Sequence, residues 1–223
     1  MSIADNLQNI KASLPAHVTL VAVSKTKPVA DLKEAYEAGQ RIFGENKIQE
    51  MTEKWEQMPR DIQWHMIGHV QTNKVKYMAP YVSLIHGVDS LKLLTEINRQ
   101  AKRYRKVIKC LLQIHIAEEE TKFGLNEEEL NALLASEEFK QMENICITGL
   151  MGMATFTDDE TQIQKEFTHL KAIFDKLKQP ELSEKTLNLK PETLSMGMSG
   201  DYKLAIDCGS TMVRIGSSIF GSR

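Results

Sequence analysis

The stretch VTLVAVSKTKP, residues 18–28, sets the fold expected for the whole chain of 223 residues. Its first part, VTLVAVS at 18–24, is rich in β-branched side chains and predicts a buried strand. A helix is expected over residues 28–38, with Gly39 behind it. The strand runs into SKTKP, whereas a dinucleotide-binding open sheet has a G-x-G-x-x-G turn after its first strand. The stretch therefore favours a barrel over a doubly wound open sheet.

The same strand-then-helix unit recurs along the rest of the chain. Further strand-like runs are found at 41–44, 63–67, 82–86, 107–116, 145–151, 193–196 and 212–215. Helical patterns separate them, at 46–57, 71–78, 90–105, from 126 onward, at 159–177 and at 201–206. Eight such units predict a single (β/α)8 TIM barrel over residues 1–223. An extra N-terminal helix is expected from the apolar spacing of Ile3, Leu7, Ile10 and Leu14, and a loop is expected at 178–191.

Composition excludes several classes of protein. With 42% hydrophobic and 26% charged residues the chain can bury a full core, which excludes disordered and fibrous proteins. The net charge of −2 comes without a basic stripe, so a nucleic-acid partner is not expected. Apolar runs stay far below the roughly 20 residues of a membrane helix, and no secretory signal is recognised. Three widely spaced cysteines suit a reducing compartment, and we expect a cytoplasmic protein.

Small residues follow the last two expected strands. In a barrel of this kind the active site lies at the C-terminal ends of the strands, and phosphate sites often use the loops after strands seven and eight. Ser199 and Gly200 follow the seventh run, and Gly216 and Ser217 follow the eighth. Their backbone N–H groups and hydroxyls could hold a phosphate. The alternative is ordinary turn chemistry, but two such loops in both expected places favour phosphate binding.

Two basic residues suggest which phosphate compound would bind. Lys25 ends an apolar strand at the expected barrel mouth, where a lysine can form a Schiff base. Arg214 lies within the apolar eighth strand and is expected to face the barrel interior. A lysine, a phosphate loop and an inward arginine together suggest pyridoxal 5′-phosphate, with the arginine at the pyridine nitrogen. Guanidinium cannot accept a proton, so that nitrogen would stay unprotonated.

Seven motifs resemble those of the pyridoxal phosphate homeostasis proteins, relatives of the alanine racemase N-terminal barrel. They are VAVSKTKP (21–28), FGENKIQE (43–50), WHMIGHVQTNK (64–74), KFGL (122–125), GLMGMAT (149–155), LSMGMSGDYKLAI (194–206) and GSTMVRIGSSIFG (209–221). The resemblance covers nearly the whole chain and implies a fold-type III barrel that binds pyridoxal phosphate as a Schiff base on Lys25. One departure is Ser217, where the family pattern has Thr more often, and a serine keeps the hydroxyl donor.

The resemblance also implies the other cofactor contacts. Asn46 and His65 would line the cofactor, Ser199, Gly200, Gly216 and Ser217 would hold its phosphate, and Arg214 would face its pyridine nitrogen. Met196 is also counted among the cofactor contacts, although a methionine at such a position more often packs in the core. The implied function is binding and supply of pyridoxal phosphate, with apo forms of pyridoxal phosphate enzymes as possible recipients. A monomer is expected, because the C-terminal β-domain that forms the racemase dimer contact is not recognised.

Other functions stay open at this point. An amino-acid racemase or related lyase is the main alternative, although the expected barrel offers only Tyr202 as a second base. A class I aldolase with a lysine Schiff base and a phosphosugar is a weaker one. A metal pair of His65 and His69 lacks a third ligand at suitable spacing, so no metal site is expected.

Overall fold

The computed structural model describes residues 2–118, 123–180 and 186–221. Its eight strands pair in parallel in chain order, and β8 pairs with β1, so the sheet closes into a barrel. The strands are β1 Thr19–Val23, β2 Ile42–Glu45, β3 Gln63–Met66, β4 Val82–Val88, β5 Ile108–Gln113, β6 Ile145–Met151, β7 Leu189–Met198 and β8 Met212–Ile215. The predicted (β/α)8 barrel is confirmed. Lys122 and residues 181–185 of the expected loop lie outside the described residues.

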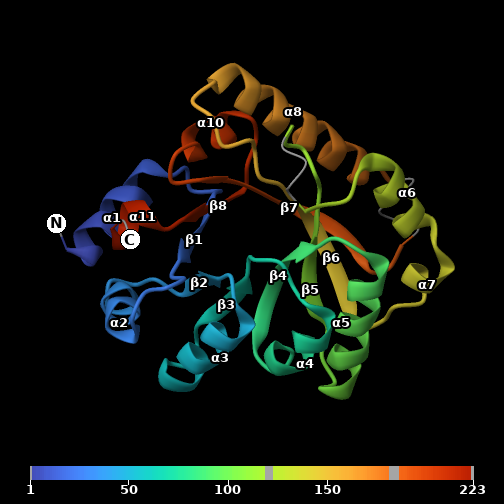
Figure 1. The fold of residues 1–223 in the computed structure, drawn as a ribbon, viewed down its shortest axis with the longest axis horizontal. Helices are drawn as coiled ribbons and strands as arrows, with labels where there is room; N and C mark the ends of the chain where they lie inside the picture. Colours follow the sequence, from blue (N-terminus) through green and yellow to red (C-terminus); the bar gives the residue numbers. More distant parts are fainter. Residues whose placement is uncertain (1, 119–122, 181–185, 222–223) are drawn as a thin grey trace.

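Helices surround the barrel (Figure 1). They are α1 Ile3–Ser13, α2 Val29–Glu37, α3 Ile48–Gln57, η1 Thr72–Lys74, α4 Val75–Met78, α5 Leu91–Arg103, α6 Glu127–Ala135, α7 Glu137–Lys140, α8 Glu160–Leu177, α10 Tyr202–Asp207 and α11 Ser217–Phe220. The expected N-terminal helix is α1, which lies beside α11 near both chain ends (Figure 1) and donates from Asn6 Nδ2 to the Ile219 carbonyl at 3.1 Å. None of the helices in the described ranges has the length and apolar character needed to cross a membrane.

Strand β7 is longer than the sequence predicted. It begins at Leu189 and includes Pro191, which we had expected in a loop. Ile147 of β6 pairs with Leu189, but Gly149, two residues later, pairs with Thr193, four residues later. The extra length of β7 is taken up in this irregular stretch, where a proline that cannot donate to the ladder is tolerated. Gly149 has a φ of +150°, and a Cβ there would overlap the Thr193 carbonyl oxygen.

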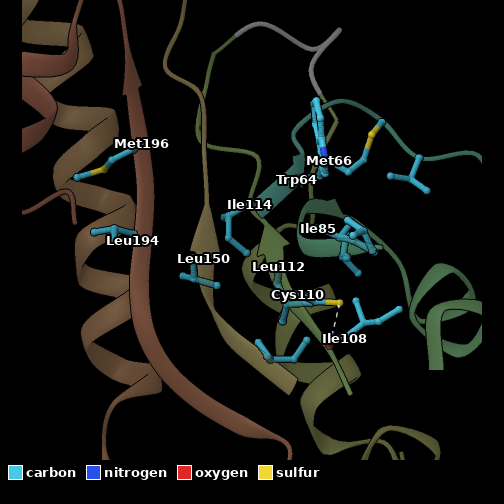
Figure 2. Packing of buried hydrophobic residues seen from close by; sticks show 14 of the residues in the cluster. Trp64, Met66, Ile85, Ile108, Cys110, Leu112, Ile114, Leu150, Leu194 and Met196 are labelled. Atoms are coloured by element: carbon cyan, nitrogen blue, oxygen red, sulfur yellow. Dashed lines mark hydrogen bonds between the residues drawn. The ribbon is translucent and has the colours of Figure 1, made fainter. Parts of the chain in front are cut away.

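The side chains of each strand point alternately outward and inward, and this separates two apolar regions. The larger core fills the space between the barrel and its helices and includes Trp64, Met66 and Met196 (Figure 2). A smaller cluster is built from alternate positions on five strands, namely Val21, Leu84, Leu111, Met151 and Met212. Successive side chains of a strand point to opposite faces. The residues between the outer-core positions, His65 among them, therefore point into the barrel.

The barrel interior also holds polar side chains close to its mouth. His86 Nε2 lies 3.1 Å from His65 Nδ1, and both imidazoles are buried. Burial lowers the pKa of His65 to about 3. Burial also lowers the pKa of His86 well below its ordinary value, and the neighbouring His65 and Arg214 add to this effect. Both rings are therefore neutral at pH 7.

The neutral histidines predict a stability loss in mild acid. A histidine whose pKa is depressed on folding stabilises the fold above its unfolded pKa of about 6.5, and that contribution is lost as the pH falls toward the folded pKa. Between the folded pKa and the unfolded pKa, each such histidine lowers the free energy of unfolding by about 1.4 kcal/mol for every pH unit below the unfolded pKa. In His65→Asn, the free energy of unfolding should therefore fall less steeply between pH 6.5 and 5, by the contribution of roughly one proton. Urea unfolding at several pH values measures it.

The exposed His17 provides the control for this experiment. His17→Asn changes a side chain that meets water in both states, so the pH dependence of unfolding should match that of the parent. Carboxylates common to all three proteins cancel in the comparison. If His65→Asn and His17→Asn gave the same slope as the parent, the buried neutral state of His65 would be contradicted.

Candidate functional site at the barrel mouth

A cavity of about 660 Å³ lies at the C-terminal ends of the strands. Lys25, Asn46, Arg214 and the segments around Ser199 and Gly216 contribute to its wall. Much of the remaining wall comes from the loops after β3, β5 and β6, which carry His69, Phe123 and Phe156. The cavity therefore draws on loops that are far apart in the sequence, as expected for the mouth of a closed barrel.

The loop that carries Lys25 is fixed from two sides. Thr26 has a φ of +64°, an unusual conformation for a residue with a branched side chain, and its N–H donates to Glu50 Oε1. Lys27 Nζ donates to the carbonyls of Phe220 and Gly221 at 2.9 and 3.1 Å. These contacts hold the partly buried Lys25 between two anchored neighbours.

A buried ion cluster supports the same loop from beneath. Lys54 Nζ donates to the Ser24 carbonyl, to Glu45 Oε1 and to Glu50 Oε1, each at 2.7 Å. Ser24 Oγ donates to the same Glu45 oxygen at 2.6 Å. Burial raises the pKa of Glu45, and the ammonium of Lys54 opposes this shift. One ammonium thus connects Ser24, the residue before Lys25, to β2 and α3.

Arg214 reaches the cavity from strand β8 while being almost fully buried. Its NH1 donates to the carbonyl and the Oγ of Ser195, at 2.9 and 2.6 Å, and its NH2 donates to the Gly152 carbonyl at 3.1 Å. Burial lowers the pKa of Arg214 to about 10, and Asp201 opposes this shift, so the group stays cationic at neutral pH. A guanidinium has five donors, which leaves capacity for a bound ligand.

The two small-residue loops lie together. Gly216 donates its N–H to Ser199 Oγ at 3.3 Å, which joins the loop after β7 to the loop after β8. The space where a Cβ of Gly200 would stand is open, whereas a Cβ on Gly216 would come within 3.1 Å of the Val23 carbonyl oxygen. Within the described chain, helix α11 starts at Ser217 without a side-chain cap, so its first N–H groups stay available to an anion.

The sequence predictions for this site can now be placed on the structure. Those residues that line the cavity are Lys25, Asn46, Ser199, Gly200, Arg214, Gly216 and Ser217. Met196 does not line it: its side chain is buried in the outer core, because its neighbour Ser195 takes the inward position on β7. His65 lies two residues before the cavity residue Ile67 and contacts His86 instead of the cavity.

Several residues of this region had no role assigned to them from the sequence. His69 stacks on Phe123, with ring centroids 4.3 Å apart, and its Nδ1 lies 3.4 Å from an Asp89 oxygen. His69 and His65 thus have separate partners, and the described residues contain no group of three side chains suited to a metal ion. Lys54 lies in an amphipathic helix whose sequence gives no sign that this lysine is buried. His86 and Ser195 each interrupt an apolar strand, which is the one signal that could have marked them.

Comparisons with known proteins agree with this geometry. The family profile described as alanine racemase, N-terminal domain, matches residues 1–223. The pyridoxal phosphate homeostasis protein of Pasteurella multocida is 38% identical, with 100% of this chain and 98% of that protein covered. The protein of the same name from Synechocystis is 40% identical over 96% of this chain and 95% of its own length.

Solved structures support the same relationship. PipY of Synechococcus elongatus PCC7942, solved without PLP, matches 99% of this chain and 100% of its own with a TM-score of 0.90 and 34% identity. The same protein with PLP bound gives a TM-score of 0.87 at the same identity. From its motifs, its closed barrel and these matches, the chain belongs to the alanine racemase N-terminal domain family, among the pyridoxal phosphate homeostasis proteins.

Proposed function

We propose that this protein binds pyridoxal 5′-phosphate at the barrel mouth, through a covalent bond to Lys25, and serves in pyridoxal phosphate homeostasis. One observation carries the proposal: a lysine, an arginine and two small-residue loops line a single cavity. The homologous PipY has been solved with PLP bound, which supports the same ligand here.

The residues present fit the chemical groups of this cofactor. Lys25 offers a primary amine, and Arg214 offers a buried cation to a ring nitrogen. The phosphate would meet the backbone N–H groups and hydroxyls of Ser199, Gly200, Gly216 and Ser217, where Gly200 leaves open space. Asn46 adds an amide to the wall between them. Backbone donors of this kind are typical partners of a phosphate dianion.

When bound, pyridoxal phosphate supplies an aldehyde that condenses with a primary amine and releases one water. The protein's part is to hold the Lys25 amine in place, to keep a cation at Arg214 and to hold the phosphate. Because the condensation is reversible, the same bond allows storage and release. We extend the proposal to supply of the cofactor to apo-enzymes by a monomeric protein.

The direct test of the proposal is the absorbance of the purified protein after incubation with pyridoxal phosphate. The parent should absorb in the violet, because the conjugated bond to a lysine shifts the absorbance of the cofactor. Lys25→Ala should lose this band. Lys33→Ala, which removes an exposed lysine on α2, should keep it. Absence of the band in the parent, or an equal band in Lys25→Ala, would sink the proposal.

The ion cluster below Lys25 leads to a second prediction. Lys54→Met should lower the free energy of unfolding by about 3 kcal/mol, because it leaves the buried Glu45 without its cation. It should also slow covalent binding roughly tenfold, because the loop bearing Lys25 loses its bond through the Ser24 carbonyl. Urea unfolding measures the first effect and the growth of the violet band measures the second.

A double variant separates stability from positioning. Glu45→Gln combined with Lys54→Met replaces the stranded carboxylate by a neutral amide, so part of the stability should return. The bond from residue 54 to the Ser24 carbonyl is still missing, so binding should stay slow. A binding rate that recovers together with stability would show that Lys54 acts on stability alone.

A further inference from the structure

Four polar side chains form a hydrogen-bonded chain across the barrel interior. Arg214 of β8 contacts Ser195 of β7 through Oγ at 2.6 Å, and this Oγ lies 3.1 Å from Nδ1 of His86 on β4. His86 Nε2 then lies 3.1 Å from Nδ1 of His65 on β3. Each of the four residues is at most 4% exposed. Of these four residues only Arg214 lines the cavity, so Ser195, His86 and His65 form a hydrogen-bonded support behind it.

The chemistry of the four groups decides which of them donates and which accepts in each hydrogen bond. Arginine can only donate, so Ser195 Oγ accepts from Arg214 and keeps one hydrogen of its own. Buried hydroxyl hydrogens are nearly always paired, and His86 Nδ1 is the acceptor within reach. His86 then carries its proton on Nε2 and donates to His65 Nδ1. Both imidazoles are neutral in this arrangement, in agreement with their burial.

We propose that His86 and Ser195 are positioning residues that hold the Arg214 guanidinium as a fixed cation against the cofactor ring, so that the ring nitrogen stays unprotonated. This inference rests on the proposed function, since it assumes pyridoxal phosphate in the cavity. His86 acts through Ser195. Because His86 Nδ1 accepts a hydrogen bond from the Ser195 hydroxyl, the Oγ lone pairs are turned toward Arg214.

The two backbone acceptors alone would hold Arg214 less firmly. The Ser195 and Gly152 carbonyls accept from NH1 and NH2, but the contact to Ser195 Oγ is the shortest of the three. Without His86, the Ser195 hydroxyl would need another acceptor for its hydrogen and would compete for nearby carbonyls. Asp201, which precedes α10, also acts on Arg214 through its charge. Substitutions at His86 or Ser195 leave Asp201 unchanged.

The test compares the full-length parent with Ser195→Ala, His86→Leu and His86→Asn, each loaded with pyridoxal phosphate. Borohydride reduction and intact mass first establish that a covalent adduct forms. The pH midpoint of the visible absorbance change is then measured. A protonated ring nitrogen adds a positive charge near the lysine-bound nitrogen and makes that nitrogen less basic. We therefore expect Ser195→Ala and His86→Leu to lower the midpoint by about one pH unit.

His86→Asn is the matched control. Its amide oxygen can accept the Ser195 hydroxyl hydrogen as Nδ1 does, so the midpoint should stay with the parent. Equal midpoints in the parent, Ser195→Ala and His86→Leu would overturn the positioning role while leaving cofactor binding intact. A parent that forms no reducible adduct would overturn the proposed function, and this inference with it.

A second measurement does not depend on how the variants fold. Nitrogen NMR of the imidazole side chains in the ligand-free parent should show both His65 and His86 neutral, with the proton on Nε2. A proton on Nδ1 of His86 would reverse the direction of the chain and overturn the inference.

Discussion

The pairing of β8 with β1 is the contact on which the whole site depends. Its register places Val21 beside Arg214 and Ala22 beside Ile215, although these residues come from opposite ends of the chain. Closure brings the loop of Lys25 to the same rim as Gly216 and Arg214, where all three line one cavity. In an open sheet with the same strand order, β1 and β8 would be the two outer edges, and no shared site would exist.

Much of this arrangement follows from local sequence. The strands at 145–151 and 212–215 were predicted to the residue, because apolar runs with clear ends define them. The start of β7 was missed, since Pro191 is acceptable only because of an irregular pairing with β6 that the sequence does not reveal. The position of Met196 depends on a similar tertiary contact: alternation fixes which residues share a face, but only the contact of Ser195 with Arg214 shows which face points inward.

The contacts behind the site could not be read from the sequence, although His86 and Ser195 each interrupt an apolar strand. Lys54 contacts three elements at once, and the chain from Arg214 to His65 joins four strands, so both depend on register across the closed barrel. Such buried polar groups are costly compared with apolar packing. These groups contact Arg214 itself and the Ser24 carbonyl next to Lys25, while five apolar side chains form a separate cluster of the barrel interior. This distribution is typical of a site where geometry matters more than maximal stability.

The central claim is that one lysine at the end of β1 forms the covalent bond to the cofactor. The most direct measurement is to treat the pyridoxal phosphate-loaded protein with borohydride, digest it, and locate the reduced pyridoxyl group by peptide mass spectrometry. The account predicts a single modified position, Lys25, at close to one group per chain. Modification spread over exposed lysines such as Lys33 and Lys47, with Lys25 unmodified, would contradict it.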